Sequence, residues 1–202
     1  MQKLTKKDVL SALNITLRLF AVCTVIAILV ASVNFITKDR IKAYELQKTT
    51  SALDSVFSGE AIKPEYREAD FELSGSVTGI YEVYDNSELL GYGVLCAPNG
   101  FKDAIKMLVA FDCDNTIIAV KVISLSETAG IGDKVMKDEF FVKQFEGKKN
   151  SITLGNDGVD AIAGATVSSK SVTKGVNDAI SMIKIYTSGK SESLDSEVLT
   201  NG

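Results

Sequence analysis

The stretch Asp160-Ala-Ile-Ala-Gly-Ala-Thr166-Val-Ser-Ser-Lys-Ser-Val172 decides how the C-terminal third of this chain folds. It places a turn of small residues immediately before apolar residues that recur at helical spacing. Those apolar residues are Val172, Val176, Ala179, Ile180 and Ile183. The spacing predicts a helix over about 168–186, and either Ser168 or Ser169 is a natural N-cap for it.

The residues before this helix are suited to a bound anion. Gly164 and Ala165 have little side chain, so a ligand can approach the backbone closely there. The free N–H groups and the positive end of the dipole at a helix start favour an anion, typically a phosphate. Thr166 would then hold its hydroxyl beside a phosphate-sized site. Because Gly-Ala-Thr also occurs in simple helix caps, the motif alone leaves both interpretations open.

The N-terminal region contains an apolar segment long enough to cross a membrane. Leu19 to Ile36 is an uncharged run of eighteen residues, and it can extend to Leu13 if the long stem of Arg18 snorkels. A spanning helix needs about 20 residues, whereas the apolar region of a cleaved signal peptide has about 7–15. We therefore predict a transmembrane helix over 19–36, preceded by a short segment at 1–18.

Charge is distributed unevenly between this region and the remainder of the chain. Residues 1–37 carry net +3 and the remainder carries net −7. Such an acidic remainder is unsuited to binding nucleic acid or anionic lipid. Basic residues are equally frequent on both sides of the span, so they do not set its orientation. We expect a single-pass protein of the cell membrane, with a cytoplasmic N-terminus and an extracytoplasmic domain.

The pattern changes from helical to alternating beyond the span. A helix is expected over 37–60, then a folded domain over 61–186, then a polar, disordered tail over 187–202. Within the domain, alternating β-forming residues between turn signals predict an antiparallel meander, in which the glycines of the second strand allow bulging or close approach. The predicted strands are Val77–Tyr84, Leu89–Cys96, Lys106–Cys113 and Ile117–Leu125. Helices flanking such a sheet indicate an α+β fold.

The composition excludes several kinds of site. The chain has no histidine, which removes His-based catalytic triads, His-ligated haem and most zinc sites. Its cysteines, Cys23, Cys96 and Cys113, form no CxxC motif, so we predict no metal centre. Cys96 and Cys113 either pair across neighbouring strands or remain isolated buried thiols, and the second alternative is favoured. No residue is predicted to be catalytic.

A second loop of small residues follows the fourth strand. Its sequence, Glu127-Thr-Ala-Gly-Ile-Gly132, leads into a candidate helix over 133–138. Alone, the loop indicates only a strand-to-helix turn. Phe140, Phe141 and Phe145 follow, and we expect them in the core, with an aromatic wall against a planar ligand as the alternative.

Taken together, the apolar span, the meander ending in this loop and Gly164-Ala-Thr166 resemble the FMN-binding domain of the G subunit of the Rnf electron-transport complex. The related C subunit of the sodium-pumping NADH:quinone oxidoreductase shares this domain. The resemblance implies an FMN attached covalently, through its phosphate, to the Thr166 hydroxyl by a separate flavin transferase that uses FAD. The family's target pattern, Asp-x-x-Ser/Thr-Gly-Ala-Thr/Ser, matches here except at Ala163.

The resemblance also implies roles for the neighbouring residues. The backbone of Gly164 and Ala165 would approach the phosphate, and Asp160 would be a strand-end or transferase-recognition residue. The loop containing Glu127, Thr128 and Gly130 would lie along the flavin ring, with the alternative that Glu127 instead satisfies N–H groups of its own loop. Further N–H or O–H donors to the phosphate would come from Val167, Ser168 and Ser169.

The function implied is that of an electron relay within an ion-translocating ferredoxin:NAD oxidoreductase. Its partners would be the membrane subunits A, D and E and the soluble subunits B and C. Electrons would arrive from a membrane-embedded iron–sulfur centre and leave to another flavin subunit. The alternatives are a stand-alone extracytoplasmic flavin carrier, the equivalent subunit of the sodium-pumping quinone reductase, and a non-redox scaffold in which Gly-Ala-Thr is only a cap.

Overall fold

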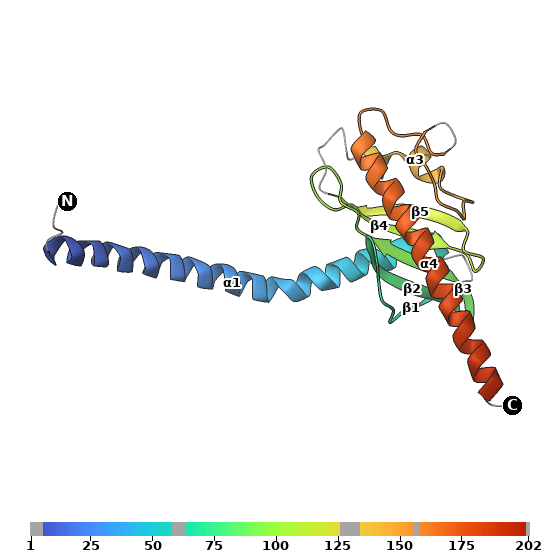
Figure 1. The fold of residues 1–202 in the computed structure, drawn as a ribbon, viewed down its shortest axis with the longest axis horizontal. Coiled ribbons are helices and arrows are strands. Elements are labelled where there is room, and N and C mark those ends of the chain that lie inside the picture. The colour runs from blue at the N-terminus through green and yellow to red at the C-terminus, as the bar shows by residue number, and fades with distance from the viewer. Residues whose placement is uncertain (1–5, 58–63, 126–133, 156–157, 201–202) are drawn as a thin grey trace. The chain divides into compact units, whose positions relative to one another are not determined.

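The computed structural model describes residues 6–57, 64–125, 134–155 and 158–200. The chain forms two compact units, Met1–Gln47 and Lys48–Gly202, and Figure 1 shows the order of their elements. The helices are α1 (Lys6–Phe57), α2 (Lys134–Lys137), α3 (Glu139–Lys143) and α4 (Thr166–Thr200). The strands are β1 (Glu65–Glu68), β2 (Val77–Asp85), β3 (Glu88–Cys96), β4 (Lys106–Phe111) and β5 (Ile117–Ser124).

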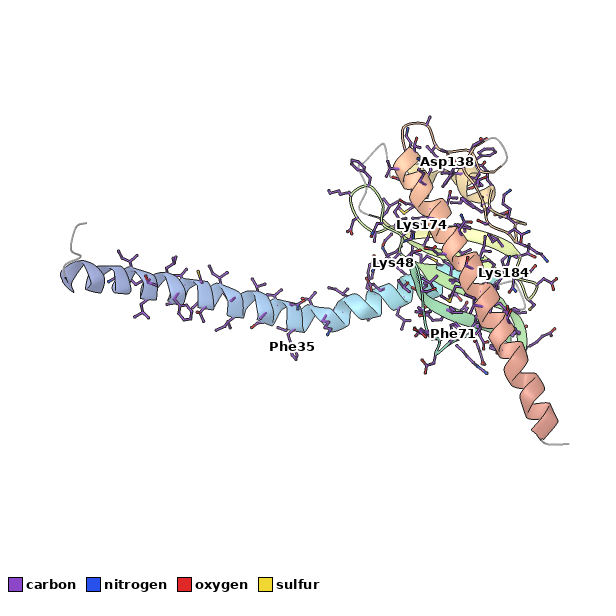
Figure 2. All side chains as sticks on the ribbon, viewed as in Figure 1. Phe35, Lys48, Phe71, Asp138, Lys174 and Lys184 are labelled. Atoms are coloured by element: carbon purple, nitrogen blue, oxygen red, sulfur yellow. The ribbon has the colours of Figure 1, made fainter. Side chains whose placement is uncertain are left out.

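The first unit consists of the larger part of α1, which is long and apolar enough to cross a membrane. Its large apolar side chains are exposed all round the helix, and Phe35 in Figure 2 is one of them. The Thr24 and Ser32 hydroxyls donate to the carbonyls of Phe20 and Ile28, at 2.8 Å in each case. Because these hydroxyls are satisfied within the helix, the surface suits lipid rather than water.

The second unit begins at Lys48, earlier than the predicted domain boundary at residue 61. The sequence predicts a helix over 37–60, continuing from or following the span, and a domain starting at 61. Helix α1 does continue from the span, to Phe57, but its last ten residues belong to the folded domain. Leu53 and Phe57 are buried against Val83 and Leu108 of the sheet. The domain therefore includes the end of the helix that carries the apolar span, because these two side chains complete its core.

The sheet has five antiparallel strands in the order β1-β2-β3-β4-β5. The four predicted strands are confirmed to within two residues at each end. Strand β1 was not predicted, because Glu65-Tyr-Arg-Glu68 is a short polar edge strand without an apolar alternation. Strands β2 and β3 are joined at Asn86 and Ser87, whose φ angles of 46° and 77° are those of a tight hairpin turn.

Both faces of the sheet are covered, which explains the unbroken apolar run of β4. Met107, Val109 and Phe111 belong to the core beneath α4, whereas Leu108 and Ala110 pack with the end of α1. This alternation follows from the period of two in a strand. A Cβ at Gly93 would lie 2.4 Å from Leu53 Cδ2, so the predicted close approach at a strand glycine is confirmed.

Helix α4 lies across the sheet in Figure 1 and supplies much of the larger core. The residues predicted to form its apolar stripe are all buried: Val172, Val176, Ala179, Ile180 and Ile183. A Cβ at Gly175 would lie 2.8 Å from Pro98 Cγ and 3.0 Å from Met107 Sδ. A glycine is therefore needed where the helix backbone passes closest to the loop that follows β3.

The C-terminal half of α4 extends beyond the predicted boundary at residue 186. The structure continues the helix to Thr200, where we expected a disordered tail, because no proline interrupts it and adding residues to an existing helix is easy. The Glu82 carboxylate accepts hydrogen bonds from Tyr84 Oη at 2.7 Å, from Tyr186 Oη at 2.8 Å and from Lys190 Nζ. The ordered contacts of α4 with the sheet therefore reach at least to Lys190.

Replacing Leu53 by alanine should destabilise the folded domain by about 2–4 kcal/mol, because a buried leucine leaves a cavity when truncated. Leu46 lies on the same helix but is exposed, so Leu46→Ala should change stability by less than about 0.5 kcal/mol. Urea unfolding of the full chain in detergent, followed by tyrosine fluorescence, measures both. Equal effects of the two substitutions would contradict the inclusion of this helical segment in the domain core.

Replacing Glu82 by glutamine should cost about 1.5–3 kcal/mol, since the carboxylate accepts charge-assisted hydrogen bonds. Burial raises the pKa of Glu82, but hydrogen bonds from Lys190, Tyr84 and Tyr186 lower it more, so the net pKa lies below the ordinary 4.5. The stabilisation is then present above about pH 4.5 and is lost as the pH falls through the lower, folded-state pKa. Between about pH 7 and pH 3, the free energy of unfolding should fall less steeply with acid in Glu82→Gln than in the wild-type protein. Glu72 is exposed, so Glu72→Gln should keep the wild-type pH dependence.

Candidate functional site

The segment that precedes α4 is a tight turn ending at the first residue of the helix. The Ala165 N–H donates to the Ile162 carbonyl at 2.9 Å, and Gly164 has a φ of +79°. A Cβ at Gly164 would meet nothing within 4 Å. Glycine is thus required here for its backbone conformation, which L-residues with a side chain rarely adopt.

Side chains from two helices hold this segment in place. The side-chain amide of Gln144 forms two hydrogen bonds with the backbone of Asp160. Its Oε1 accepts from the Asp160 N–H at 2.8 Å, and its Nε2 donates to the Asp160 carbonyl at 3.4 Å. Ser169 Oγ accepts from the Ile162 N–H at 3.1 Å and donates to the Ala165 carbonyl at 3.0 Å. We named Asp160 from its sequence motif, but no local signal identified Gln144, which lies sixteen residues earlier.

The predicted N-cap is wrong. Helix α4 starts at Thr166, two residues before the predicted start, because the turn closed by Ala165 lets the Ser169 N–H bond the Ala165 carbonyl at 2.9 Å. Ser168 and Ser169 therefore lie inside the first turns rather than capping them. The N–H and O–H groups of Ser169 are both used within the protein, so the prediction that they are donors to a ligand is also wrong.

The hydroxyl groups of this region differ sharply in exposure. Thr166 is exposed, whereas Ser168, Ser169, Ser171 and Thr173 have exposed fractions of 2%, 0%, 8% and 5%. Ser171 Oγ donates to the Asn99 carbonyl at 2.6 Å, and Thr173 Oγ1 donates to the Ser169 carbonyl at 3.0 Å. Among the hydroxyl groups from 166 to 173, Thr166 is thus the one that a solvent-borne reagent can reach.

The helix end around Thr166 has a positive electrostatic character. The N–H groups of Thr166, Val167 and Ser168 precede the first intrahelical hydrogen bond. No acidic residue lies in the first turn of α4 to offset the helix dipole. Val167 is exposed, whereas Ala165 is buried and contributes its backbone rather than its side chain to the surface. An anion at this end of the helix would be stabilised.

The second loop named from the sequence, with Glu127, Thr128 and Gly130, lies outside the described residues. Its flanks are β5, which ends at Ser124, and α2, which begins at Lys134. Val135 of α2 is fully buried, and α2 packs against α4.

The three phenylalanines expected in the core do not behave alike. Phe141 and Phe145 are buried and meet edge to face, with ring centroids 5.5 Å apart. Phe140 is 73% exposed, which corrects its assignment to the core. The difference follows from the phase of α3, whose start is fixed by Asp138, labelled in Figure 2, since its Oδ1 accepts from the N–H groups of Phe140 and Phe141.

The cysteines are all free, so Cys96 and Cys113 do not pair. Cys96 is buried as predicted, whereas Cys113 is exposed, which corrects its assignment as a buried thiol. Cys96 lies opposite Met107 in the sheet register, at one end of β3. Cys113 Sγ donates to the Leu89 carbonyl at the other end of that strand. Burial raises the pKa of both thiols, with a further contribution from Asp178 at Cys96 and from Asp112 at Cys113. Neither is therefore a thiolate nucleophile at neutral pH. Within the described ranges, no group of His, Cys, Asp and Glu side chains could hold a metal ion.

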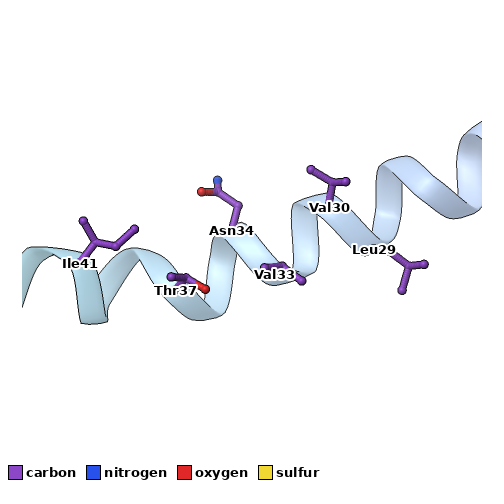
Figure 3. Close-up of a pocket in the computed structure, with 6 residues that line it drawn as sticks. All are labelled: Leu29, Val30, Val33, Asn34, Thr37 and Ile41. Atoms are coloured by element: carbon purple, nitrogen blue, oxygen red, sulfur yellow. The ribbon is translucent and has the colours of Figure 1, made fainter. Parts of the chain in front are cut away.

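One hollow on the protein is unrelated to this site. Figure 3 shows that it lies on the apolar part of α1. It is lined by Leu29, Val30, Val33, Asn34, Thr37 and Ile41. Because all six residues belong to one helix, the hollow has a single wall and cannot enclose a ligand.

Comparisons with known proteins match both parts of the chain. The family model described as the FMN-binding domain matches residues 100–181, which include Thr166. The model described as the RnfG N-terminal region matches residues 10–56, which include the apolar span. The fold and the site therefore define an FMN-binding domain that follows an apolar helix.

Curated relatives extend over most of the chain. The G subunit of the Na(+)-translocating ferredoxin:NAD(+) oxidoreductase complex of Acetobacterium woodii is 30% identical over 80% of this chain and 86% of its own. The G subunit of the proton-translocating complex of Clostridium ljungdahlii is 29% identical over 91% of this chain and 98% of its own. The crystal structure of Shewanella oneidensis NqrC is 29% identical and covers 49% of this chain and 53% of its own, with a TM-score of 0.43.

This chain belongs to the family of G subunits of the ion-translocating ferredoxin:NAD(+) oxidoreductase complexes. The sequence resemblance to that family is thereby confirmed. The five-stranded antiparallel sheet and its flanking helices confirm the predicted α+β fold.

Ser169→Ala should loosen the turn before α4 without unfolding the helix, because it removes the acceptor of the Ile162 N–H. The loss of one such hydrogen bond, about 1 kcal/mol, corresponds to about fivefold faster amide hydrogen exchange in residues 160–165. Thr173→Ala is the matched control, since its hydroxyl bonds only to its own helix. Unchanged exchange in Ser169→Ala would show that the serine does not hold the turn.

Proposed function

We propose that this chain is the membrane-anchored, FMN-carrying electron-relay subunit of an Rnf-type ion-translocating ferredoxin:NAD oxidoreductase. The FMN is held by a phosphoester between its phosphate and Thr166 Oγ1. The observation that carries the proposal is the accessibility of one hydroxyl. Thr166 is exposed at the positive end of a long helix, whereas the next four hydroxyl residues are buried, and the FMN-binding domain match includes this position.

The described residues fit a phosphate at this position. The N–H groups of Thr166, Val167 and Ser168 precede the first helical bond, so they are available as donors to phosphate oxygens. The positive φ of Gly164 and the open space beside it leave the backbone accessible. Ser169 and Gln144 contribute indirectly, because they hold the turn that presents Thr166.

The attachment is a phosphoryl transfer from FAD that a separate flavin transferase catalyses. The Thr166 oxygen forms a bond to the phosphorus of the FMN half, the bond between the two phosphates of FAD breaks, and AMP leaves. The hydroxyl proton passes to a base that the transferase supplies, and no atom changes oxidation state. Asp160 lies at the start of the turn, exposed and with its backbone fixed by Gln144, where an enzyme that binds the segment would meet it.

Bound FMN supplies reversible one- and two-electron redox chemistry, and the protein supplies its placement. The covalent attachment would keep the cofactor on helix α4. Phe140, near the start of α3, is an exposed aromatic side chain and a candidate for contact with a planar ring. The segment with Glu127, Thr128 and Gly130 lies along the ring in this proposal. Electrons arrive from a membrane-embedded iron–sulfur centre and leave to another flavin subunit, with subunits A, B, C, D and E as partners.

The topology proposed is a single pass in the cell membrane, with residues 1–18 in the cytoplasm and the FMN domain outside. The helix long enough to span a membrane and the acidic remainder of the chain support it. Relatives of nearly equal identity belong to complexes named for protons and for Na(+). Because the two matches do not separate the ions, we assign this subunit a role in electron transfer and name no coupling ion.

Full-length protein produced with a flavin transferase should gain the mass of one FMN less one water, on the peptide that contains Thr166. Thr166→Ala should abolish the gain, Thr166→Ser should retain it, and Ser168→Ala and Ser171→Ala should leave it unchanged because those hydroxyls are buried. Intact mass and peptide mapping measure all five proteins. If the wild-type protein gained no mass, the proposed covalent attachment would be contradicted. If the purified protein were also colourless, the scaffold alternative would be favoured.

The same purification distinguishes the complex subunit from a stand-alone carrier. Under mild detergent, a subunit of the complex should co-purify with other membrane subunits in a stable ratio. A flavin-loaded protein that purifies alone under every condition would favour the stand-alone carrier.

A further inference from the structure

We propose that Lys170 is a phosphate-binding residue of this site, and that its ammonium group pairs with the phosphate attached to Thr166. The inference rests on the proposed function and adds a residue to it. Lys170 follows Thr166 by four residues in α4, and both side chains are exposed. Residues at this spacing lie one above the other on the same helix face.

The direction of helical side chains brings Lys170 toward the site. A Cα–Cβ bond in a helix tilts toward the N-terminus, so a long side chain covers the turn before its own residue. For Lys170, that turn begins at Thr166. A flexible four-carbon stem then carries the ammonium group to the end of the helix where the N–H groups of the first turn are also directed.

Among the described residues, Lys170 has no charged or hydrogen-bonding side-chain partner, unlike the lysines that follow it in α4. Lys174 Nζ lies 3.0 Å from Asp178 Oδ2, Lys184 Nζ lies 3.1 Å from Asn150 Oδ1, and Lys190 pairs with Glu82. Figure 2 labels Lys174 and Lys184 on this helix. Lys170 makes no ion pair or side-chain hydrogen bond with any residue that the structure describes.

Without a bound anion, the positive charge of Lys170 lies near the positive end of the α4 helix dipole. A cation near a helix N-terminus is disfavoured by the dipole, and the first turn of α4 contains no acidic residue to offset it. The domain is acidic as a whole, with net −7 beyond residue 37. A cluster of positive character at one helix end of an acidic domain is explained if a phosphate normally occupies it.

An alternative partner among the described residues is the exposed carboxylate of Asp160, which precedes the turn before α4. If Asp160 were the partner of Lys170, the lysine would be paired before the flavin is attached and its reactivity would not depend on loading. If the phosphate is the partner, the lysine changes its protonation behaviour only when Thr166 carries FMN. The two alternatives therefore predict different results for the same lysine in loaded and unloaded protein.

The test is the pH dependence of acetylation of Lys170 in full-length protein with and without FMN. Acetic anhydride acylates only the neutral amine, and peptide mapping reports each lysine separately. Pairing with the phosphate should raise the titration midpoint of Lys170 by about half a pH unit on loading and slow its acetylation about two- to fivefold, the range of an exposed ion pair. High salt should remove most of this difference.

Three comparisons make the result specific. Lys174, already paired with Asp178, should show the same midpoint in both forms, and Lys170 in Thr166→Ala should behave as in unloaded protein. In loaded protein, Lys170→Gln should shift the ³¹P resonance of the phosphodiester, whereas Lys174→Gln should not. These readouts need no activity from the complex.

The outcomes separate the two proposals. If Thr166 carries no FMN, the proposed function fails at the mass measurement, before Lys170 is considered. If Thr166 carries FMN but the midpoint of Lys170 does not move, the pairing proposed here is overturned alone. Slower acetylation at every pH with an unchanged midpoint also overturns it, because that result indicates steric cover by the flavin instead of an ion pair.

Discussion

The close contact between helix α4 and the sheet is the constraint on which the rest of the domain depends. Gly175 allows the helix backbone to meet Pro98 and Met107, and the buried residues on either side fix the rotation of the helix about its axis. The Asn177 amide, bonded at 2.8 Å to both the N–H and the carbonyl of Ile152, ties the preceding loop to the same helix. Thr166 is therefore presented by a rigid element whose position is set far from the site itself.

The same sheet also receives the end of α1 on its other face. Alternate residues of β4 contact the two helices, so Leu108 packs with Leu53 while Met107 packs beneath α4. A strand buried on both faces leaves little room for local adjustment, because protein interiors are close-packed. The domain core consequently depends on ten residues that continue directly from the apolar helix, and a boundary drawn at the first strand would remove part of that core.

Sequence patterns predicted the regular parts of this fold and missed what depends on contacts between distant residues. Strands β2 to β5 and the apolar stripe of α4 follow from local periodicity, which is why they are confirmed. The start of α4 was misplaced because serine is a common N-cap, whereas the turn closed by Ala165 begins the helix earlier. Gln144 carried no signal, because its amide has a role only when α3 meets Asp160 in the folded chain. Phe140 and Phe141 are the same residue type, and only the helix phase separates an exposed ring from a buried one.

If the flavin is attached to Thr166 as proposed, the exposure of the hydroxyl groups would select this site without discrimination between residue types. Five serine and threonine residues lie between 166 and 173, and any of them is chemically able to accept a phosphoryl group. In the folded domain four of them are buried, and Ser169, Ser171 and Thr173 donate to backbone carbonyls. These buried hydroxyls are already engaged within the protein, so a reagent in solvent does not meet them. An enzyme that acts on the folded domain therefore meets Thr166 alone, whereas an enzyme that acts on the unfolded chain would have to choose among five. Under the proposed attachment to Thr166, this geometry favours modification after folding.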